Sequence, residues 1–357
     1  MAEPFVRFDL AKIEANARAI VADCARRGIS VAGVTKCTCG DPDVARAMLS
    51  GGVVEIGESR LENVLRLRRA GVRARFLLLR VPPLSAVEHV VDAVDVSLDS
   101  ELDVLAGLSA AALRRGRRHD VVLMVDLGDL REGIWPDDLT RFTREALQLA
   151  GVRIVGVGAN LTCFGGVAPT RENMARLVAL ADEVERTFGL ALTYVSGGNS
   201  SALELIAAGG MPARINHLRV GEAILLGRET LHRRAWPGTS QDAFEIQAEV
   251  IELKEKPSLP IGEPAQDAFG HVPHFVDAGD RIRALLDIGR EDVDPEGLTP
   301  VDSRARVLGA SSDYLIVDVT AIAPPVKVGD FLAFVPSYAA LLAAMTSPYL
   351  AKRPVRG

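Results

Sequence analysis

The chain has 357 residues, of which 48% are hydrophobic and 25% are charged, and its net charge is −6. This length and composition are sufficient for two domains with full hydrophobic cores. The acidic balance gives no basic surface of the kind that binds nucleic acid, and no apolar run reaches the roughly 18 residues of a membrane span. The sequence therefore predicts a globular protein without nucleic-acid or membrane partners.

The four cysteines do not have the spacing of a metal site. Cys37 and Cys39 are separated by one residue, Cys24 and Cys163 lie apart, and no histidine cluster completes a ligand set. The N-terminal residues also lack the basic and then apolar pattern of a signal peptide. We therefore expect no metal, reduced thiols and a cytoplasmic location.

Apolar strand candidates alternate with amphipathic helices along the first two thirds of the chain. After a short strand at 6–10, the expected strands lie at 30–36, 53–56, 76–79, 94–98, 121–125, 154–157, 192–195 and 215–218. Helices are expected at 11–27, 43–49, 60–70, 101–115, 138–149, 171–188 and 201–208. Eight such units predict a parallel, closed (β/α)₈ barrel, or TIM barrel, over residues 1–235.

The pattern changes after residue 235. A linker-like stretch at 236–240 precedes strand candidates without intervening helices, at 244–253, 281–288, 305–308, 314–319 and 331–335, and a short helix is expected at 338–345. Residues 236–357 therefore predict a smaller, mainly β domain, and residues 1–9 are candidates for pairing with it.

Lys36 follows an apolar, β-branched run and precedes turn-forming residues. Burial lowers the pKa of a lysine, and a neutral amine can attack a carbonyl, so Lys36 is a candidate Schiff-base residue. The alternative is a lysine at a strand end whose ammonium reaches water. In barrels of this kind the reacting groups lie at the carboxyl ends of the strands, where Lys36 is expected.

Other polar groups follow the remaining strands. The segment Ser-Gly-Gly-Asn-Ser-Ser at 196–201 combines glycines with an expected helix start, which suits an anion. Ser200 or Ser201 can donate to that anion, and either can instead be a helix cap. Gly221 follows the eighth strand, where barrels often bind phosphate. Arg219 can donate to a ring nitrogen, pair a ligand carboxylate or form a salt bridge with Glu222.

Two further groups complete this rim. Arg131 can bind a substrate carboxylate or belong to an ion-pair network with its acidic neighbours, and Asn160 can contact a bound ring or only the backbone. A lysine, an anion site and a partner for a ring nitrogen are the three requirements of pyridoxal 5′-phosphate.

Short motifs along nearly the whole chain carry a family resemblance. They lie at 34–36, 39–42, 56–63, 160–166, 196–201, 216–222, 266–270 and 289–298. With them the chain resembles the fold-type III pyridoxal-phosphate enzymes of the alanine racemase superfamily, and most of all the ornithine racemase-like group. The resemblance implies a barrel followed by a β domain, and a head-to-tail homodimer with active sites at its interface.

The resemblance also implies roles for single residues. Lys36 would carry the Schiff base, Arg219 would face the pyridine nitrogen, and Ser200 with the backbone at Gly221 and Glu222 would bind the phosphate. Arg131 would lie near the substrate carboxylate, and Asn160 beside the ring, where alanine racemases place a histidine. The late tyrosine that reaches the phosphate would be Tyr338 or Tyr349.

One departure concerns the second base. Alanine racemases use a tyrosine of the partner subunit within a Gly-Tyr-Ala-Asp motif, and the matching residues here are Gly-Arg-Glu-Asp. Arg290 takes the tyrosine position and is a poor base, because the pKa of a guanidinium stays above about 12. Asp267, His271 and Asp292 remain candidates. The lysine motif also lacks the Ala-Asn-Ala-Tyr-Gly continuation, and both departures argue against alanine as the substrate.

The sequence thus predicts a pyridoxal-phosphate-dependent isomerase, an amino-acid racemase with Lys36 as one of two bases. A basic substrate such as ornithine, lysine or arginine is expected if acidic residues bind its side chain, the candidates being Asp126, Asp129, Glu132 and Asp267. A solvated acidic loop is the alternative for these residues. A decarboxylase of the same fold and a catalytically silent homologue are the alternative functions.

Overall fold

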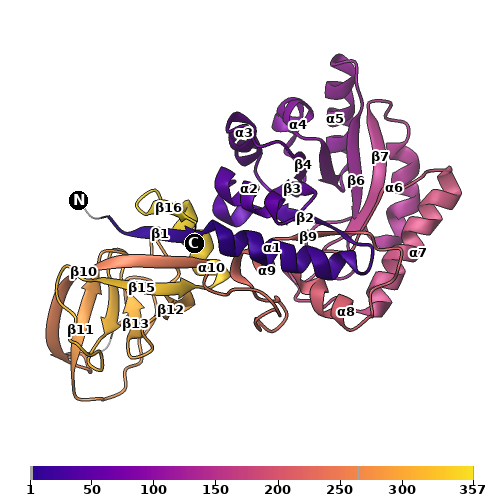
Figure 1. Cartoon of the computed structure of the whole chain (residues 1–357). Coiled ribbons are helices and arrows are strands. Elements are labelled where there is room, and N and C mark those ends of the chain that lie inside the picture. The colour runs from indigo at the N-terminus through magenta and orange to yellow at the C-terminus, as the bar shows by residue number, and fades with distance from the viewer. Residues whose placement is uncertain (1–2, 264, 357) are drawn as a thin grey trace. The chain divides into compact units, whose positions relative to one another are not determined.

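The computed structural model of the chain describes residues 3–263 and 265–356. The chain folds into two compact units (Figure 1). The barrel unit comprises Leu10–Gln241, and the β unit comprises Met1–Asp9 and Asp242–Arg356.

The barrel unit is a closed ring of eight parallel strands in the order β2-β3-β4-β5-β6-β7-β8-β9, which confirms the predicted (β/α)₈ barrel. The strands are β2 Ser30–Val34, β3 Glu55–Glu58, β4 Arg75–Leu78, β5 Val96–Asp99, β6 His119–Val125, β7 Val152–Ala159, β8 Tyr194–Ser196 and β9 His217–Val220. The helices are α1 Leu10–Ala25, α2 Pro42–Ser50, α3 Leu61–Arg69, α4 Val87–Ala93, α5 Leu102–Arg114, α6 Leu139–Ala146, α7 Arg171–Phe188, α8 Leu203–Ala207 and α9 Glu222–Leu226.

Local sequence signals start the helices that follow the strands. Asp41 caps α2 by accepting hydrogen bonds from the N–H groups of Asp43 and Val44, and a proline occupies the first helical position. Thr170 and Asn173 form a reciprocal capping box at the start of α7. These caps fix where α2 and α7 begin, and the long connections after β6, which ends at Val125, and β7, which ends at Ala159, form much of the carboxyl rim.

The inside of the barrel is a packed core. Side chains from alternate positions of the strands meet there, namely Ala32, Leu77, Val96, Leu98, Val122, Met124, Val155 and Tyr194. These side chains fill the interior, so the barrel has no pore, as is usual for eight-stranded barrels. Ligand chemistry is therefore confined to the rim.

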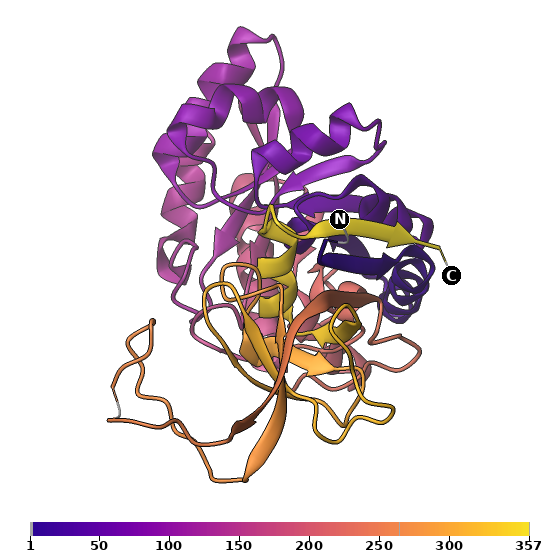
Figure 2. The same ribbon diagram turned by 90° about the vertical axis from the view of Figure 1, so that its left-hand side faces the viewer.

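The β unit is an eight-stranded sheet in which β12-β15-β10-β11-β14-β13 are neighbours and β1 pairs with β10 and β16. Its elements are β1 Phe5–Asp9, β10 Phe244–Pro257, β11 Asp280–Leu286, β12 Leu298–Pro300, β13 Arg306–Ala310, β14 Leu315–Asp318, β15 Phe331–Pro336, α10 Tyr338–Thr346 and β16 Ala351–Val355. The predicted β domain is thereby confirmed. Its long connection between β10 and β11 extends away from the strands (Figure 2).

Two strands of the β unit were not expected from the sequence. β12 has only three residues, and β16 contains a proline and several polar residues, so neither shows an alternating apolar pattern. β16 forms only because the first strand of the chain offers it a parallel partner, Phe5 opposite Ala351. Among the described residues, no helix has the length and apolarity needed to cross a membrane.

Asp99 is a buried carboxylate at the end of β5. One of its oxygens accepts a hydrogen bond of 2.6 Å from Ser97, and the other has no partner among the described residues. Burial raises the pKa of Asp99 from 3.8 to about 7, because the charged form is not solvated. The native protein therefore binds more protons than the unfolded chain between these two values, and its stability falls as the pH rises through that window.

Replacing Asp99 with Asn should raise the free energy of unfolding above neutral pH by on the order of 1–3 kcal/mol, because an amide carries no charge to desolvate. The variant should also lose the decline in stability between pH 4 and 7. Urea unfolding at a series of pH values measures both effects. Asp137→Asn, at an exposed position of the same unit, is the matched control. A loss of stability in Asp99→Asn at alkaline pH would contradict this account.

Candidate active site

Lys36 lies on the carboxyl rim of the barrel. β2 ends at Val34, two residues earlier than the sequence indicated, and Lys36 opens the short 3₁₀ helix Lys36–Thr38. Its side chain is half-buried, and its Nζ atom has no hydrogen bond or ion pair with any residue that the structure describes. Its positive charge still acts on the carboxylate of Glu222, so the two lie near each other.

The loop that carries Lys36 is tied to the next strand by a buried polar network. Thr35 donates a hydrogen bond of 2.6 Å to one oxygen of Glu58, and Asn63 donates one of 3.0 Å to the other. Glu58 is fully buried, and burial raises its pKa. Because Thr35 precedes Lys36, this network fixes where the amine emerges from the rim.

Gly40 brings the same loop against α3. It has a φ of 63°, and a Cβ atom at this position would lie 2.7 Å from the Cβ atom of Asn63. Only glycine adopts this conformation at such close range without strain. The carbonyl of Cys39 accepts a hydrogen bond from Arg66, which holds the preceding turn against α3 as well.

The loops after β8 and β9 meet beside one another. The N–H of Ala223, in the first turn of α9, donates a hydrogen bond of 3.2 Å to the hydroxyl of Ser200. The hydroxyl of Ser201 is buried and has no partner among the described residues. Gly198 has a φ of 113° and faces open space, because a Cβ atom at this position would have no neighbouring atom within 4 Å. The loop after β8 therefore offers the Ser201 hydroxyl, which has no partner among the described residues, and space for a small group at Gly198.

Glu222 contributes a carboxylate at the start of α9. It pairs with Arg233, and burial raises its pKa while Arg233 and Lys36 act in the opposite direction. The loop that carries Arg233 is organised by the buried Glu229, which accepts backbone hydrogen bonds from Leu231, His232 and Arg234. Glu222 thus does not leave an uncompensated negative charge beside Ser200.

Arg219 is a buried cation on β9. Its guanidinium donates to the hydroxyl of Ser196, to the carbonyl of Ala159 at 2.8 Å, and to Asn160 Oδ1 at 3.5 Å. Burial lowers its pKa to about 10, so it stays charged at neutral pH. Asn199 in turn donates to Asn160 Oδ1 at 3.0 Å.

Asn160 is thus part of a network, because its amide also donates to Cys163 Sγ at 3.0 Å. The sequence did not single out Cys163 or Asn199 for this rim. Asn199 lies within the Gly-rich motif at 196–201 and Cys163 within the motif at 160–166, and these motifs were the available signals.

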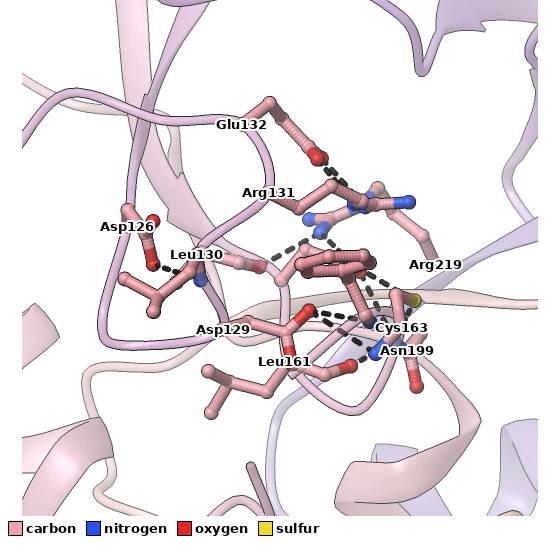
Figure 3. A network of polar contacts seen from close by, with 12 residues as sticks. Asp126, Asp129, Leu130, Arg131, Glu132, Leu161, Cys163, Asn199 and Arg219 are labelled. Atoms are coloured by element: carbon pink, nitrogen blue, oxygen red, sulfur yellow. Dashed lines mark hydrogen bonds and ion pairs between the residues drawn. The ribbon is translucent and has the colours of Figure 1, made fainter. Parts of the chain in front are cut away.

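Arg131 pairs with its neighbour Glu132, and both charges act on Arg219 (Figure 3). The nearby carboxylates have different tasks. Asp126 accepts hydrogen bonds from the N–H groups of Gly128 and Leu130 at 2.8 and 3.2 Å. Its Oδ1 atom organises the loop after β6, so Asp126 is engaged by its own backbone.

Asp129 joins two rim loops. Its carboxylate is buried and accepts backbone hydrogen bonds from Cys163, Phe164 and Val167 in the loop after β7. Like Asp126, it is therefore committed to loop structure rather than exposed to a ligand.

The remaining candidates belong to the β unit. Asp267 caps a turn by accepting hydrogen bonds of 2.9 Å from the N–H groups of Phe269 and His271. Asp292 is buried and accepts from the N–H of Gly289 and the hydroxyl of Ser347. The structure places Tyr338 at the start of α10, half-buried, and leaves Tyr349 64% exposed.

Arg290 is held within the same unit. Its guanidinium lies 5.1 Å from the ring centroid of Phe269 and forms a two-pronged ion pair with Glu296. This pair raises the pKa of Arg290 and lowers that of Glu296 to about 2. Arg290 is therefore a fixed cation and not a base.

Comparison with known proteins identifies the family. The model of the alanine racemase N-terminal domain matches residues 8–229. The chain belongs to the alanine racemase family. It is 44% identical over 350 residues to an ornithine racemase of Acetoanaerobium sticklandii, a match that covers 98% of this chain and 99% of that protein. It is also 43% identical over 352 residues to a lysine racemase of Thermotoga maritima, and this match covers 99% of this chain and 98% of that protein.

Solved structures share the fold of this alanine racemase family member. The alanine racemase from D-cycloserine-producing Streptomyces lavendulae has a TM-score of 0.78 at 20% identity, over 100% of this chain and 98% of that one. The D-threonine aldolase from Filomicrobium marinum has a TM-score of 0.73 at 17% identity, over 97% of this chain and 89% of that one. At these identities the likeness concerns the fold alone.

Pyridoxal 5′-phosphate is the cofactor of the family, and the groups on the rim suit it. Among the described residues, the Lys36 amine has no hydrogen-bond partner and can receive the aldehyde. The Ser201 hydroxyl has no partner within the same part of the chain, and with the space at Gly198 it suits a phosphate. Arg219 offers N–H donors for a ring nitrogen. Among the described residues, no cluster of His, Cys, Asp or Glu could hold a metal ion.

Replacing Gly40 with Ala should destabilise the protein by about 1–3 kcal/mol, through backbone strain and the contact with Asn63. It should also lower cofactor affinity, because the loop carries Lys36. Gly28→Ala is a matched control, since Gly28 has a φ of 69° but no atom within 4 Å of the added Cβ. Thermal unfolding and cofactor titration measure the two effects. Equal losses in the two variants would show that the packing of Gly40 on Asn63 is unimportant.

Proposed function

We propose that this chain is a pyridoxal-phosphate-dependent racemase of basic amino acids, with ornithine and lysine as its substrates. The near full-length identity to an ornithine racemase and a lysine racemase carries the proposal. The unpartnered amine of Lys36 on the barrel rim agrees with it.

The bound cofactor would supply an aldehyde that captures the substrate amine and an electron sink for the substrate Cα. Lys36 Nζ would hold the cofactor, and the same amine would take the α-proton of the substrate from one face. Ser200 and the backbone at Gly221 and Glu222 bind the phosphate. Arg219 presents N–H donors to the ring nitrogen, Asn160 lies beside the ring, and Arg131 binds the substrate carboxylate.

Inversion requires a second group that acts on the opposite face. We propose the pair of Asp267 and His271, whose Oδ2 and Nδ1 atoms lie 3.8 Å apart. His271 is well exposed, and an imidazole can give and take a proton near neutral pH. Asp292 is a weaker candidate, because both of its oxygens already accept hydrogen bonds in a buried position.

We also propose that the chain acts as a homodimer in which the β unit of a second copy provides this second group. The connection between β10 and β11 exposes several large apolar side chains, including Ile261 at 94%, Val272 at 53% and Val276 at 83%. An exposed apolar segment of this kind is typical of an interaction surface. This exposed apolar segment supports the proposed homodimer. The family resemblance, which implies a head-to-tail homodimer, supports it as well.

Lys36→Ala should lose the visible absorption of the lysine-bound cofactor and about 10³-fold or more of the racemisation rate. Chiral chromatography after incubation with L-ornithine and L-lysine measures that rate. A wild-type protein that produces no D-enantiomer from either would disprove the racemase. Release of carbon dioxide and a diamine would instead identify a decarboxylase.

Subunit mixing extends this experiment to the second base. Lys36→Ala and His271→Asn should each be inactive alone, and exchange of subunits between them should restore activity, because one site of each mixed dimer is complete. If the mixture stays inactive while sedimentation shows that mixed dimers form, the second group does not come from the other copy.

Glu132 is the carboxylate on the barrel rim that can recognise a basic side chain. Asp126 and Asp129 are engaged by backbone N–H groups, whereas Glu132 is partly exposed and pairs only with the neighbouring Arg131 among the described residues. Such exposed pairs contribute about 0–1 kcal/mol. A substrate with both a carboxylate and a side-chain ammonium can therefore replace the pair at little cost, with its carboxylate on Arg131 and its ammonium on Glu132.

Glu132→Gln should lower kcat/KM for ornithine and lysine by about 10- to 100-fold, the loss expected for one charge-assisted contact of 1.5–3 kcal/mol. The kcat/KM for methionine should not fall, because its side chain is similar in length to that of ornithine but carries no charge. Glu145→Gln is the matched control, because Glu145 forms an exposed ion pair with Arg141 on α6. Equal losses for charged and uncharged substrates would assign Glu132 a structural role instead.

A further inference from the structure

The interior of the barrel holds a short polar chain directly behind Arg219. Ser196 ends β8 and His217 begins β9, and the two are paired in register. The hydroxyl of Ser196 lies 2.7 Å from His217 Nδ1 and also accepts a hydrogen bond from Arg219 Nη1. The three residues are between 1% and 4% exposed, so no bulk water competes for these contacts.

The direction of each hydrogen bond in this chain follows from its donors. A guanidinium has only donors, so Ser196 must accept from Arg219. The hydroxyl could also accept a second hydrogen bond from a protonated Nδ1, but its own hydrogen would then have no acceptor among the described residues. The arrangement that uses this hydrogen has the hydroxyl donate to His217 Nδ1. A ring that accepts at Nδ1 carries its proton on Nε2 and is neutral. Geometry thus selects one tautomer of His217.

The surroundings of His217 also disfavour its charged form. Burial and the positive charge of Arg219 lower its pKa to about 3. The ring of Tyr194 packs edge-on against it at 5.0 Å, and the Tyr194 hydroxyl donates to Glu55 at 2.9 Å. Arg75 lies over the other side of Tyr194. His217 Nε2 has no hydrogen-bond partner among the described residues.

Arg219 is consequently fixed from two sides. Ser196 holds Nη1, and the carbonyl of Ala159 holds Nη2 at 2.8 Å. Rotation of the guanidinium would break one or both of these contacts in a buried site, which costs about 1–3 kcal/mol for each orphaned group. No hydrogen bond of Nε is found among the described residues, so the guanidinium keeps donor capacity for a ligand.

We propose that Ser196 and His217 are positioning residues that orient the Arg219 guanidinium toward the cofactor ring without neutralising its charge. This inference rests on the proposed cofactor site. His217 is an acceptor without charge, so it orients the Ser196 hydroxyl and leaves the cation of Arg219 unneutralised. A carboxylate at position 217 would instead draw the positive charge away from the ring.

His217→Leu and His217→Asn are a matched pair of variants. The Asn side chain retains an acceptor near the position of Nδ1, whereas Leu has a similar size and no acceptor. We expect His217→Leu to shift the visible absorption maximum of the bound cofactor and to lower kcat about 10-fold with little change in KM. His217→Asn should restore both properties. His89→Leu, at an exposed position on α4, should change neither.

Nitrogen-15 NMR of the histidine rings provides a readout that does not depend on catalysis. His217, assigned by its absence from His217→Leu, should show a protonated Nε2 and an accepting Nδ1 that do not titrate near neutral pH. Ser196→Ala should change the Nδ1 signal and the cofactor spectrum together, and it serves as the second variant if His217→Leu does not fold.

Two results would overturn the inference, namely a His217 ring that titrates near neutral pH and identical cofactor spectra in His217→Leu and His217→Asn. A protein that binds the cofactor and shows the expected NMR signals, but does not racemise ornithine or lysine, would disprove the proposed function and leave the role of Ser196 and His217 intact.

Discussion

The pairing of β2 with β9 closes the barrel, and the candidate active site depends on it. The register sets Ala32 opposite Arg219 and Gly33 opposite Val220, so the loop after β2 lies beside the loop after β9. This closure brings Lys36 near Glu222, although 186 positions separate them in the chain. Ser200 is then joined to α9 through the N–H of Ala223. Without the closure, the Lys36 amine and the loop that carries Ser200 would not lie side by side on one rim.

Buried polar groups then give this rim its precision. Glu58 holds the strand end before Lys36, Asp129 holds the loop after β7, and Ser196 holds Arg219. Each is a polar group whose loss of solvation is offset by specific donors or acceptors, so each tolerates few alternative arrangements. A site built in this way keeps its shape before any ligand binds, which reduces the entropy that binding must overcome.

The sequence predicted the architecture well and the site in part. Alternating apolar strands and amphipathic helices indicated the barrel, and the position of Lys36, Ser200 and Arg219 at strand ends marked the rim. It could not separate Asp126 and Asp129 from Glu132, because their roles depend on which backbone N–H groups face each carboxylate. It gave no role to Ser196 and His217, although both lie in motifs, at 196–201 and 216–222, because their contact depends on which strands pair in the barrel. The assigned roles of the site residues remain predictions.

The sequence by itself determined the class of fold, the lysine and the family resemblance, because periodicity and short motifs are local properties of the chain. Only the tertiary structure decided which polar side chains meet. Hydrogen bonds such as that between Ser196 and His217 form between strands that are distant in sequence, and their geometry depends on strand register. The same holds for Gly40, whose need for glycine comes from the proximity of Asn63 on α3 as well as from its own backbone conformation.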